Sequence, residues 1–316
     1  MSSIYQTLNN IVTNAEKVIV GKRDTISMVL ISLICNGHVL VEDVPGVGKT
    51  SMVSAVAKSI NASVNRIQFT PDTLPSDITG FSVYNMKSNE LEFKPGAVFS
   101  QFVLADEINR TSPKTQASLL EAMEESQVTV DGVTHKMPRP FMVLATQNPA
   151  EYLGTWPLPE SQLDRFFMKL KVGYPTAKQE SRMLTNFKLE NPLEKLEAVA
   201  TPEDILEIQE QVRNVHVDDS INDYIVSIVA ETRRNPLVEL GVSPRGTLAL
   251  YRAAQAWALC SGRDYMVPDD VVKVAQVVLG HRVMLRQEAR MKNMTAASVV
   301  TDAVERVKPP LLAAHG

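Results

Sequence analysis

Residues 42–51 combine residue types and a spacing that could hold a polyphosphate. They read Glu-Asp-Val-Pro-Gly-Val-Gly-Lys-Thr-Ser, follow an apolar run and precede a helix-compatible stretch. In a strand–glycine loop–helix arrangement, backbone amides and the helix N-terminus surround an anion, a lysine reaches the β- and γ-phosphates, and a threonine hydroxyl can hold Mg²⁺. With Thr50 as a metal ligand, we expect a nucleotide site formed by Pro45, Gly46, Val47, Gly48, Lys49, Thr50 and Ser51.

One position departs from the usual phosphate-loop pattern, G-x-x-x-x-G-K-[ST]. The pattern has glycine where this chain has Asp43, although Gly46 and Gly48 still allow the backbone to approach a ligand closely. Taken alone, the segment could also be a strand–turn–helix junction with a surface lysine at position 49. A second signal further along the chain bears on this choice.

The second signal is a pair of carboxylates at the end of an apolar run. Residues 101–110 read Gln-Phe-Val-Leu-Ala-Asp-Glu-Ile-Asn-Arg, so a predicted strand ends in Asp106 and Glu107. Adjacent side chains of a strand point in different directions, so one carboxylate can face a metal and the other a water molecule. We expect Asp106 to order Mg²⁺, directly or through water, and Glu107 to act as general base in ATP hydrolysis. The alternative is an acidic pair that only caps a strand and opens a turn.

Further short segments follow in an order that is informative as a set. After residues 42–50 and 104–110 come Leu-Leu-Glu-Ala-Met-Glu-Glu at 119–125, Ala-Thr-Gln-Asn-Pro at 145–149, Leu-Asp-Arg-Phe at 163–166 and Ser-Pro-Arg-Gly at 243–246. Together they resemble the MoxR family of AAA+ ATPases, over roughly residues 18–285. Asp43 is itself similar to what this family shows, so the missing glycine agrees with the resemblance.

The resemblance implies roles for residues outside the two motifs. Asn148, at the end of a strand-like run, resembles sensor 1, whose amide hydrogen-bonds the γ-phosphate or the attacking water. It is also compatible with an Asn-Pro turn. Val20 and Gly21 resemble the backbone stretch that contacts adenine, and a helix-to-loop hinge is the alternative reading of these two residues.

Two arginines resemble groups that act on the γ-phosphate. Arg165 looks like the arginine finger, which works in trans on the nucleotide of a neighbouring subunit and stabilises transition-state charge. The alternative is an ion pair with Asp164 or another acid of the same chain. Arg245 resembles sensor 2, and the Ser243-Pro244 start signal places it in the first turn of a helix. A cation is poorly placed at a helix N-terminus, which a nearby anion such as a phosphate would explain.

Predicted strands alternate with predicted helices through the first half of the chain. The predicted strands are 39–42, 64–69, 102–106, 141–146 and 166–172, and the predicted helices are 4–19, 23–35, 51–60 and 112–125. Such alternation indicates an α/β core around a parallel sheet. The resemblance implies a P-loop AAA+ core whose five strands follow the order 5-1-4-3-2, which the sequence alone does not determine.

Two short segments add to this core. Residues 80–99 look like a hairpin-like loop and correspond in the family to the helix-2 insert, which faces the central pore. This segment carries the aromatic residues Phe81, Tyr84 and Phe93. It could touch a bound partner, or it could be a surface flap with its own apolar anchor. Residues 127–137 alternate strictly around Asp131-Gly132, which predicts a β-hairpin, the pre-sensor-1 hairpin of the family.

Only helices are predicted after Pro175. Start signals occur at Thr201-Pro202, Ser220, Ser243-Pro244 and Pro268-Asp269. We therefore expect an α/β nucleotide-binding core at residues 1–175 and an all-α lid domain at residues 176–316, with the boundary between about 174 and 200.

Composition argues against several classes of protein. A net charge of −4 argues against a dedicated nucleic-acid motor, which should show a basic face. No uninterrupted apolar stretch reaches ~18 residues, so no membrane span is expected, and the N-terminus lacks the layout of a signal peptide. Cys35 and Cys260 lie in apolar contexts without pairing or metal spacing, as in a reducing compartment. We expect a cytoplasmic protein.

Together these expectations describe a Mg²⁺-dependent ATPase that works in a ring. The resemblance implies a hexamer with ATP between core and lid, Arg165 supplied by the next subunit, and chaperone-like maturation or remodelling of partner complexes, often with a von Willebrand factor A-domain partner. Alternatives are an ATP-gated scaffold with little turnover, a nucleic-acid remodeller of the helicase-loader type and a magnesium-chelatase-like motor. Intact Glu107 and Asn148 count against the scaffold, and the acidic balance counts against the nucleic-acid remodeller.

Overall fold

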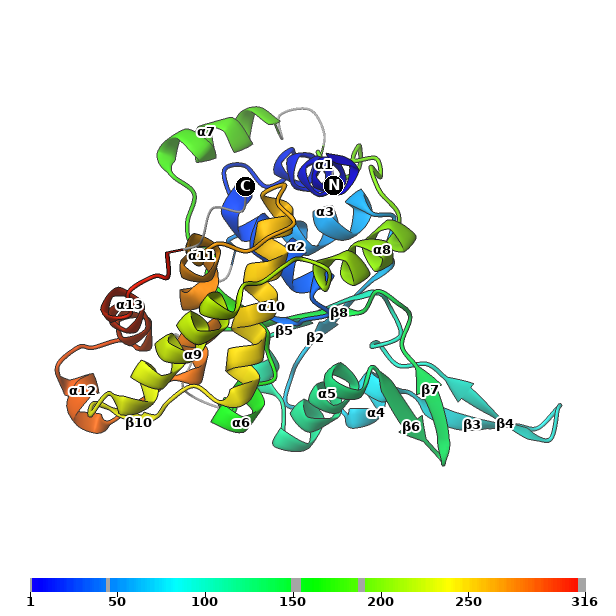
Figure 1. Ribbon diagram of the computed structural model, residues 1–316. Helices are drawn as coiled ribbons and strands as arrows, with labels where there is room; N and C mark the ends of the chain where they lie inside the picture. Colours follow the sequence, from blue (N-terminus) through cyan, green and yellow to red (C-terminus); the bar gives the residue numbers. More distant parts are fainter. Residues whose placement is uncertain (1, 44–45, 149–154, 187–190, 312–316) are drawn as a thin grey trace.

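A five-stranded parallel sheet forms the centre of the molecule. The computed structural model describes residues 2–43, 46–148, 155–186 and 191–311 (Figure 1). The strands of the sheet are β1 (Val39–Glu42), β2 (Val64–Gln68), β5 (Phe102–Asp106), β8 (Met142–Gln147) and β9 (Met168–Leu170). They lie in the order β2-β5-β8-β1-β9, and all neighbours are parallel. When these five strands are renumbered 1 to 5 along the chain and read from β9 to β2, the order is 5-1-4-3-2. The expected AAA+ arrangement is therefore confirmed.

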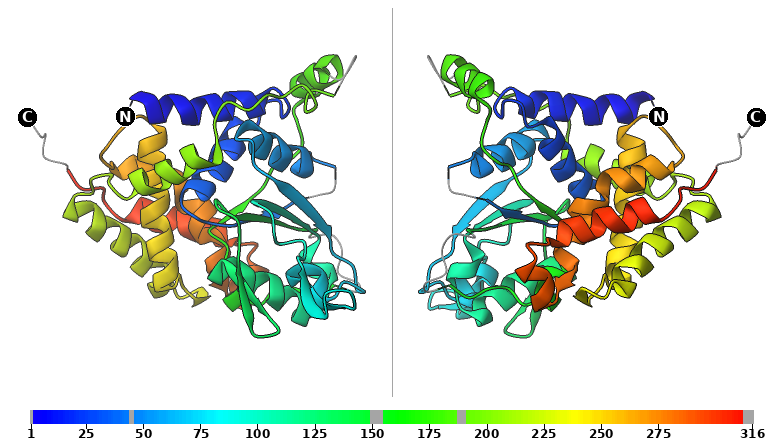
Figure 2. Two further views of the ribbon diagram at one scale, coloured as in Figure 1. Left: turned by 90° about the vertical axis from the view of Figure 1, so that its right-hand side faces the viewer. Right: turned by 90° about the vertical axis from the view of Figure 1, so that its left-hand side faces the viewer.

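Helices cover both faces of the sheet. Val39 and Val41 of β1 belong to a hydrophobic cluster with α1 (Ser2–Glu16), α2 (Arg23–Ile34) and α3 (Lys49–Ser59). Leu40 points to the other face and joins a cluster with α5 (Pro113–Glu125). Figure 2 shows these helices above and below the sheet. Burial on both faces explains why the strands read as continuous apolar runs and could be predicted from them.

Helices make up most of the chain after β9. They are α7 (Ala177–Asn186), α8 (Pro202–Val212), α9 (Asp219–Arg234), α10 (Pro244–Cys260), α11 (Pro268–Leu279), α12 (Gln287–Met291) and α13 (Ala296–Arg306), with a 3-10 turn η2 (Gly280–Arg282). Two start signals act as predicted: the Thr201 hydroxyl accepts the Asp204 N–H, and the Ser243 hydroxyl accepts the Gly246 N–H. These bonds satisfy amides that have no partner within their own helix.

Three features of this half differ from the sequence-based expectation. Helix α9 begins at Asp219 rather than at Ser220, because the Asp218 carboxylate caps it by accepting the Ser220 N–H at 2.9 Å. Helices α7, α12 and α13 were not among those predicted. A short antiparallel pair, β10 (Val238–Leu240) and β11 (Met284–Leu285), lies among the helices, and strands this short show no alternation. The division between core and lid at residue 175 stays a prediction.

The helical half packs against the α1–α3 side of the core. One continuous cluster includes Leu33 of α2, Ile205 of α8 and Leu250 of α10. A buried hydrogen bond from Gln209 Nε2 to the Leu33 carbonyl, 2.9 Å, fixes α8 on α2. Figure 1 shows α10 running alongside α2 toward the sheet. The N-terminal end of α10 therefore reaches the core close to β9.

Two antiparallel hairpins extend from the opposite edge of the core, as the sequence predicted. They are β3–β4 (Phe81–Asn85 and Glu90–Lys94) and β6–β7 (Gln127–Val130 and Val133–Lys136). Asp131 and Gly132 have φ values of 50° and 79°, as a two-residue hairpin turn requires. Phe93 stacks on His135 with ring centroids 3.8 Å apart, so the hairpins touch near their base.

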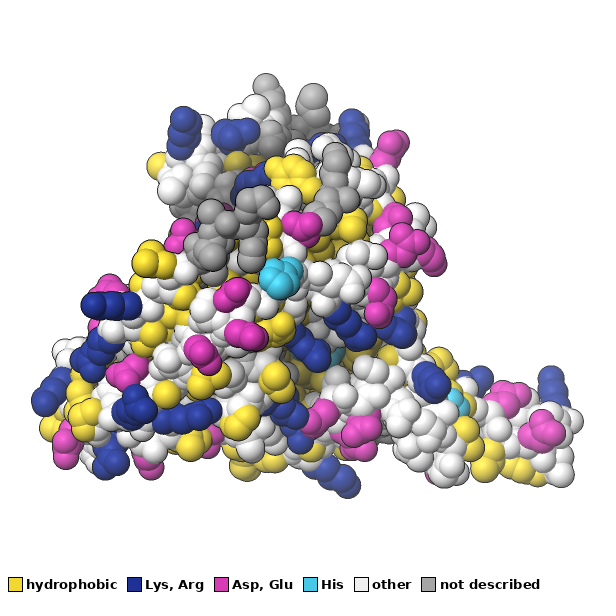
Figure 3. Space-filling model, viewed as in Figure 1, with side chains coloured by type: hydrophobic (Ala, Val, Ile, Leu, Met, Phe, Trp, Pro, Cys, Tyr) yellow, Lys and Arg dark blue, Asp and Glu magenta, His cyan; other side chains and the backbone are white. Residues whose placement is uncertain are grey.

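The β3–β4 hairpin projects from the body of the molecule (Figure 1). Tyr84, Met86 and Leu91 are exposed on it, and Figure 3 shows apolar side chains mixed with charged ones along this projection. Elsewhere on the face shown in Figure 3, basic and acidic side chains are interspersed. Among the described residues, no helix is both long and apolar enough to cross a lipid bilayer.

Candidate functional site

The phosphate loop lies at the carboxyl end of β1, where the chain turns into α3. Gly46 and Gly48 have φ values of 84° and 88°, in the left-handed region that favours glycine. Helix α3 begins at Lys49, two residues earlier than predicted, so Lys49, Thr50 and Ser51 form its first turn. Val47 is half-buried and packs on the core, and Pro45 lies outside the described residues.

Asp43, at the position where the usual pattern has glycine, ties the loop to the chain after β9. Its Oδ2 accepts the backbone N–H groups of Val172 and Gly173 at 2.7 and 2.5 Å. Its carbonyl accepts a hydrogen bond from Lys49 Nζ at 2.9 Å. Burial lowers the pKa of Lys49, while the carboxylates of Asp43, Asp106 and Glu107 oppose that shift and favour its charged form.

The carboxylates expected to serve metal and water lie beside the loop. Both line one cavity of about 330 Å³ together with Gly46, Gly48, Lys49, Thr50, Ser51, Arg66, Gln68, Thr146 and Asn148. We call this cavity the loop pocket. Parallel strands bring their carboxyl ends to one edge of a sheet, which is why residues from β1, β5 and β8 meet there.

Asp106 and Glu107 are each held by several hydrogen bonds. Asp106 Oδ1 accepts the Thr146 hydroxyl and Oδ2 accepts Arg66 Nε, both at 2.9 Å. Glu107 has φ +59°, which turns its side chain out of the strand direction. Its Oε2 accepts Gln68 Nε2 at 2.9 Å and Arg110 Nη1 at 3.0 Å.

Arg66 and Gln68 are site residues that the sequence analysis missed. Both lie on β2, where they alternate with the buried Ile67, and Gln68 pairs in register with Asp106 of β5. Arg66 also donates to Gln68 Oε1 at 3.0 Å, so the two acids are linked by one polar chain. Alternation on a strand next to β5 in the order 5-1-4-3-2 could have pointed to them.

Asn148 follows β8 and lines the same pocket, 7% exposed. The sheet order places β8 between β5 and β1, so Asn148 lies between the acids and the phosphate loop. Its position agrees with the expected sensor 1. Its role in the reaction stays a prediction.

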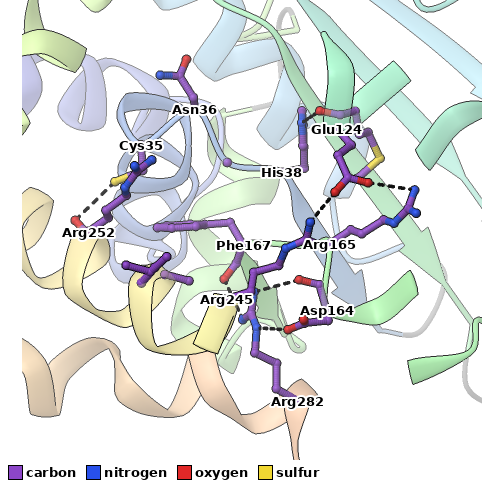
Figure 4. Close-up of a pocket in the computed structure, with 14 residues that line it drawn as sticks. Cys35, Asn36, His38, Glu124, Asp164, Arg165, Phe167, Arg245, Arg252 and Arg282 are labelled. Carbon is purple, nitrogen blue, oxygen red and sulfur yellow. Dashed lines mark hydrogen bonds and ion pairs between the residues drawn. The ribbon is translucent and has the colours of Figure 1, made fainter. Parts of the chain in front are cut away.

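Arg165 and Arg245 do not line the loop pocket. They line a second cavity of about 380 Å³ between the core and α10, which we call the arginine pocket (Figure 4). Arg165 Nη1 lies 3.3 Å from Glu124 Oε2, and Arg245 Nη2 pairs with Glu124 Oε1. The anion expected beside Arg245 is thus a carboxylate of the same chain, and the intrachain partner considered for Arg165 is Glu124 rather than Asp164.

Asp164 instead joins the core to the lid helices. Its Oδ1 accepts Arg282 Nε at 2.8 Å, and its Oδ2 accepts the hydroxyl of Ser243, the N-cap of α10, at 2.9 Å. Arg282 is 7% exposed and also donates to the carbonyls of Phe166 and Val278. Burial lowers the pKa of Arg282 and Asp164 opposes the shift. This network of Asp164, Ser243 and Arg282 was not predicted from the sequence.

His38 fixes the end of α5 from inside the protein. Its Nδ1 accepts the Val143 N–H at 3.0 Å, so its Nε2 donates to the Met123 carbonyl at 2.9 Å. Burial lowers the pKa of His38 to about 4, which keeps the ring neutral and preserves both bonds at physiological pH. Glu124 is the next residue after this anchored carbonyl.

Val20 and Gly21, the expected adenine contacts, lie in the turn between α1 and α2. Val20 is buried, and the Gly21 carbonyl accepts Gln179 Nε2 of α7 at 3.1 Å. Ile19 reaches toward the loop: its Cδ1 is 3.8 Å from where a Cβ would stand on Gly48. The turn therefore neighbours the phosphate loop, and the adenine role stays a prediction.

Two family models match this chain. Residues 38–168 match a model described as the ATPase family associated with various cellular activities (AAA), and residues 230–303 match an AAA lid domain. The first match contains both loop-pocket acids and Lys49, and the second contains Arg245 and Arg282.

Relatives match over almost the whole length. The uncharacterized protein YeaC of Bacillus subtilis is 54% identical, covering 98% of this chain and 96% of that protein. The chaperone MoxR1 of Mycobacterium tuberculosis is 38% identical, covering 98% of this chain and 84% of that protein. A crystal structure of a candidate ATPase from Cytophaga hutchinsonii is 36% identical with a TM-score of 0.92, covering 98% of this chain and 97% of the other.

Proposed function

Because this chain belongs to the MoxR family of AAA+ ATPases, we propose that it uses Mg²⁺-dependent ATP hydrolysis to remodel or mature partner protein complexes. The observation that carries this proposal is the loop pocket. It gathers a cation and a hydroxyl from the first turn of α3 with two carboxylates and an amide from distant strand ends: Lys49, Thr50, Asp106, Glu107 and Asn148.

The donors of the loop pocket fit the proposed cofactors. Thr50 and Asp106 offer the oxygen ligands that Mg²⁺ prefers, and the first-turn amides of α3 together with Lys49 suit a polyphosphate. When bound, Mg²⁺·ATP supplies an activated γ-phosphoryl group that water can attack. The Glu107 carboxylate would accept the proton of that water after giving up its hydrogen bonds with Gln68 and Arg110. Asn148 would orient the reacting groups.

The arginine pocket supports assembly into a ring. Arg165 and Arg245 lie together in a cavity of their own, so neither lines the pocket that holds Lys49 of the same subunit. We place both arginines at the nucleotide of a neighbouring subunit, where they stabilise charge on the transferred phosphoryl group. A hexamer is the ring that we propose.

We propose that the partner is a protein and that a protein with a von Willebrand factor A-domain is one candidate. The relative from Mycobacterium tuberculosis is named a chaperone, which supports this class of output. The projecting β3–β4 hairpin, with exposed Tyr84, Met86 and Leu91, offers a surface that nucleotide-driven movement could present to a partner.

Both cysteines are free, as is usual in a reducing compartment, so we propose a cytoplasmic location.

The test is ATP turnover with and without Mg²⁺, followed by mixing two inactive variants. Lys49→Ala disables a subunit's own loop pocket, and Arg165→Ala disables the pocket of its neighbour. Mixed rings should regain activity wherever an Arg165→Ala site meets the intact Arg165 of a Lys49→Ala subunit.

Each part of the proposal has its own contrary result. ATP binding without Mg²⁺-dependent turnover would support a nucleotide-gated scaffold instead. Salt-sensitive DNA binding coupled to turnover would support a nucleic-acid remodeller. Mixed assemblies without any recovered activity would show that Arg165 acts within its own subunit.

A further inference from the structure

Glu124 bridges the two arginines of the arginine pocket. One carboxylate oxygen faces Arg165 and the other faces Arg245, as Figure 4 shows. The side chains of Arg165, Glu124 and Arg245 are 34%, 37% and 48% exposed, so the group stands at the surface and not in the core. Each guanidinium turns one terminal nitrogen toward Glu124, while a guanidinium carries five N–H donors in all. Donors other than these two can therefore serve a second anion.

The three side chains are mounted on anchored backbone. His38 holds the Met123 carbonyl, which precedes Glu124 at the end of α5. Asp164, which precedes Arg165, binds both Arg282 and the N-cap of α10, where Arg245 occupies the first turn. The relative placement of the bridging acid and the two cations is thus fixed by a buried contact on the α5 side and by part-buried contacts of Asp164 on the other side.

Stability of the fold is a poor explanation for this bridge. Exposed ion pairs contribute roughly 0–1 kcal/mol, and a carboxylate near the C-terminus of a helix is unfavourable toward the helix dipole. Two neighbouring guanidinium groups also repel each other. Glu124 offsets this repulsion and holds both groups on one side of the pocket, where a polyphosphate could bind them together.

We propose that Glu124 is a positioning residue that holds Arg165 and Arg245 side by side as one unit directed at the triphosphate of the neighbouring subunit. This inference rests on the proposed function, because it assigns Glu124 to the half-site that one subunit offers to the next. Glu124 acts only through the two arginines and does not touch the reacting atoms.

Glu124→Gln is the informative variant, with Glu125→Gln as its control. A glutamine offers one acceptor oxygen, and its NH₂ group faces the donors of the second guanidinium, so only one of the two pairs can persist. Glu125 is exposed at the next position of the same helix, and its replacement makes the same change in charge. Misplacing a catalytic group by about 1 Å can cost roughly 10²-fold in rate.

We expect Glu124→Gln to lower kcat by roughly 10–10²-fold while ATP affinity at its own loop pocket and KM stay unchanged. Glu125→Gln should behave like the wild type. Mixing Glu124→Gln with Lys49→Ala should restore activity, because the Lys49→Ala subunit supplies an intact arginine pocket. Glu124→Asp keeps the charge on a shorter side chain and should lose less activity than Glu124→Gln.

Three results would overturn the inference. Equal rates for Glu124→Gln and Glu125→Gln would remove any role for the bridge. A slow Glu124→Gln variant that Lys49→Ala does not rescue, although Arg165→Ala is rescued, would place Glu124 in its own subunit's site. A faster Glu124→Gln variant would show that the acid restrains the arginines. Failure of the Arg165→Ala mixture would instead count against the proposed ring, whatever Glu124 does.

Discussion

The loop pocket and the arginine pocket are built in different ways. The loop pocket takes its residues from the ends of neighbouring strands, the phosphate loop and the first turn of α3, which follows that loop directly. The arginine pocket draws on the connection between α2 and β1, on α5, the chain before β9, α10 and η2, so core and helical half must meet to form it. It holds four arginines against two carboxylates, whereas the loop pocket holds two cations against two carboxylates.

The difference is what the proposed ring expects if the two kinds of pocket are two halves of one site. The loop pocket gathers the groups that the proposed nucleotide needs, but its two cations only balance its two carboxylates. The arginine pocket has excess positive charge, and its guanidinium groups suit a further anion besides Glu124 and Asp164. In the proposed ring, the two pockets of one subunit belong to two different sites, and the following experiments test that division.

The largest expected effects are on ATP binding for the loop pocket and on kcat for the arginine pocket. Lys49→Ala should abolish ATP binding, because it removes the lysine of the phosphate loop. Arg165→Ala should keep ATP binding at its own site and lower kcat by roughly 10³–10⁵-fold, as for other arginine fingers. Arg245→Ala should follow Arg165→Ala rather than Lys49→Ala, because it shares the arginine pocket. Titration with a fluorescent ATP analogue and steady-state turnover measure the two quantities, and loss of ATP affinity in either arginine variant would break the division.

The next largest effect on kcat is expected from Glu107→Gln, a substitution in the loop pocket. The amide can keep hydrogen bonds but cannot accept the proton of the attacking water, so kcat should fall roughly 10²–10⁴-fold. ATP binding should persist, since Glu107 lies beyond the loop amides and Lys49. A turnover rate near that of the wild type would show that another group is the base.

Removing an arginine should lower the free energy of unfolding more in the arginine pocket than in the loop pocket. Arg282 is buried beneath the arginine pocket, so Arg282→Met leaves Asp164 without its buried partner and should lower the free energy of unfolding by about 3–5 kcal/mol. Arg66 in the loop pocket also pairs with an aspartate, but its side chain is 55% exposed. Arg66→Met should therefore cost about 0–1 kcal/mol. Urea denaturation compares them, and equal losses would contradict the view that only the arginine pocket depends on a buried arginine.

Low pH should lower the free energy of unfolding through His38, which holds the end of α5 beside the arginine pocket. The pKa of His38 is lowered from 6.5 to about 4 in the folded protein, so the unfolded chain takes up a proton first as the pH falls. The stability present above pH 6.5 should decline between about pH 6.5 and 4, by roughly 3 kcal/mol from this residue. Burial also lowers the pKa of His281, which acts in the same direction.

Denaturation of the wild type and of His38→Gln at pH 7.5 and pH 4.5 measures this effect. The difference in unfolding free energy between the two pH values should be smaller in His38→Gln, while His281 retains its part. An unchanged difference would show that His38 does not hold the end of α5 as a neutral ring.

Local signals in the sequence were enough for the loop pocket. Gly46, Gly48 and Lys49 stand almost next to each other, and Asp106-Glu107 ends an apolar run, so each motif is legible without knowing the fold. The strands could be predicted because both faces of the sheet are buried. The two-residue strand β11 carried no comparable signal, whereas α13 begins at an N-cap, Thr295, that the prediction did not use. The start of α9 shifted because the carboxylate of Asp218 caps it.

The sequence by itself determined the phosphate loop, its two acids, the strands and, through the resemblance, their order. Only the tertiary structure decided that Arg165 and Arg245 share a pocket with Glu124, apart from Lys49, and that Asp164 pairs with Arg282. These contacts join residues up to 121 positions apart. They depend on how α10 and η2 pack against the core, and neither helical periodicity nor motif spacing encodes the distance between two elements that meet only through side-chain packing.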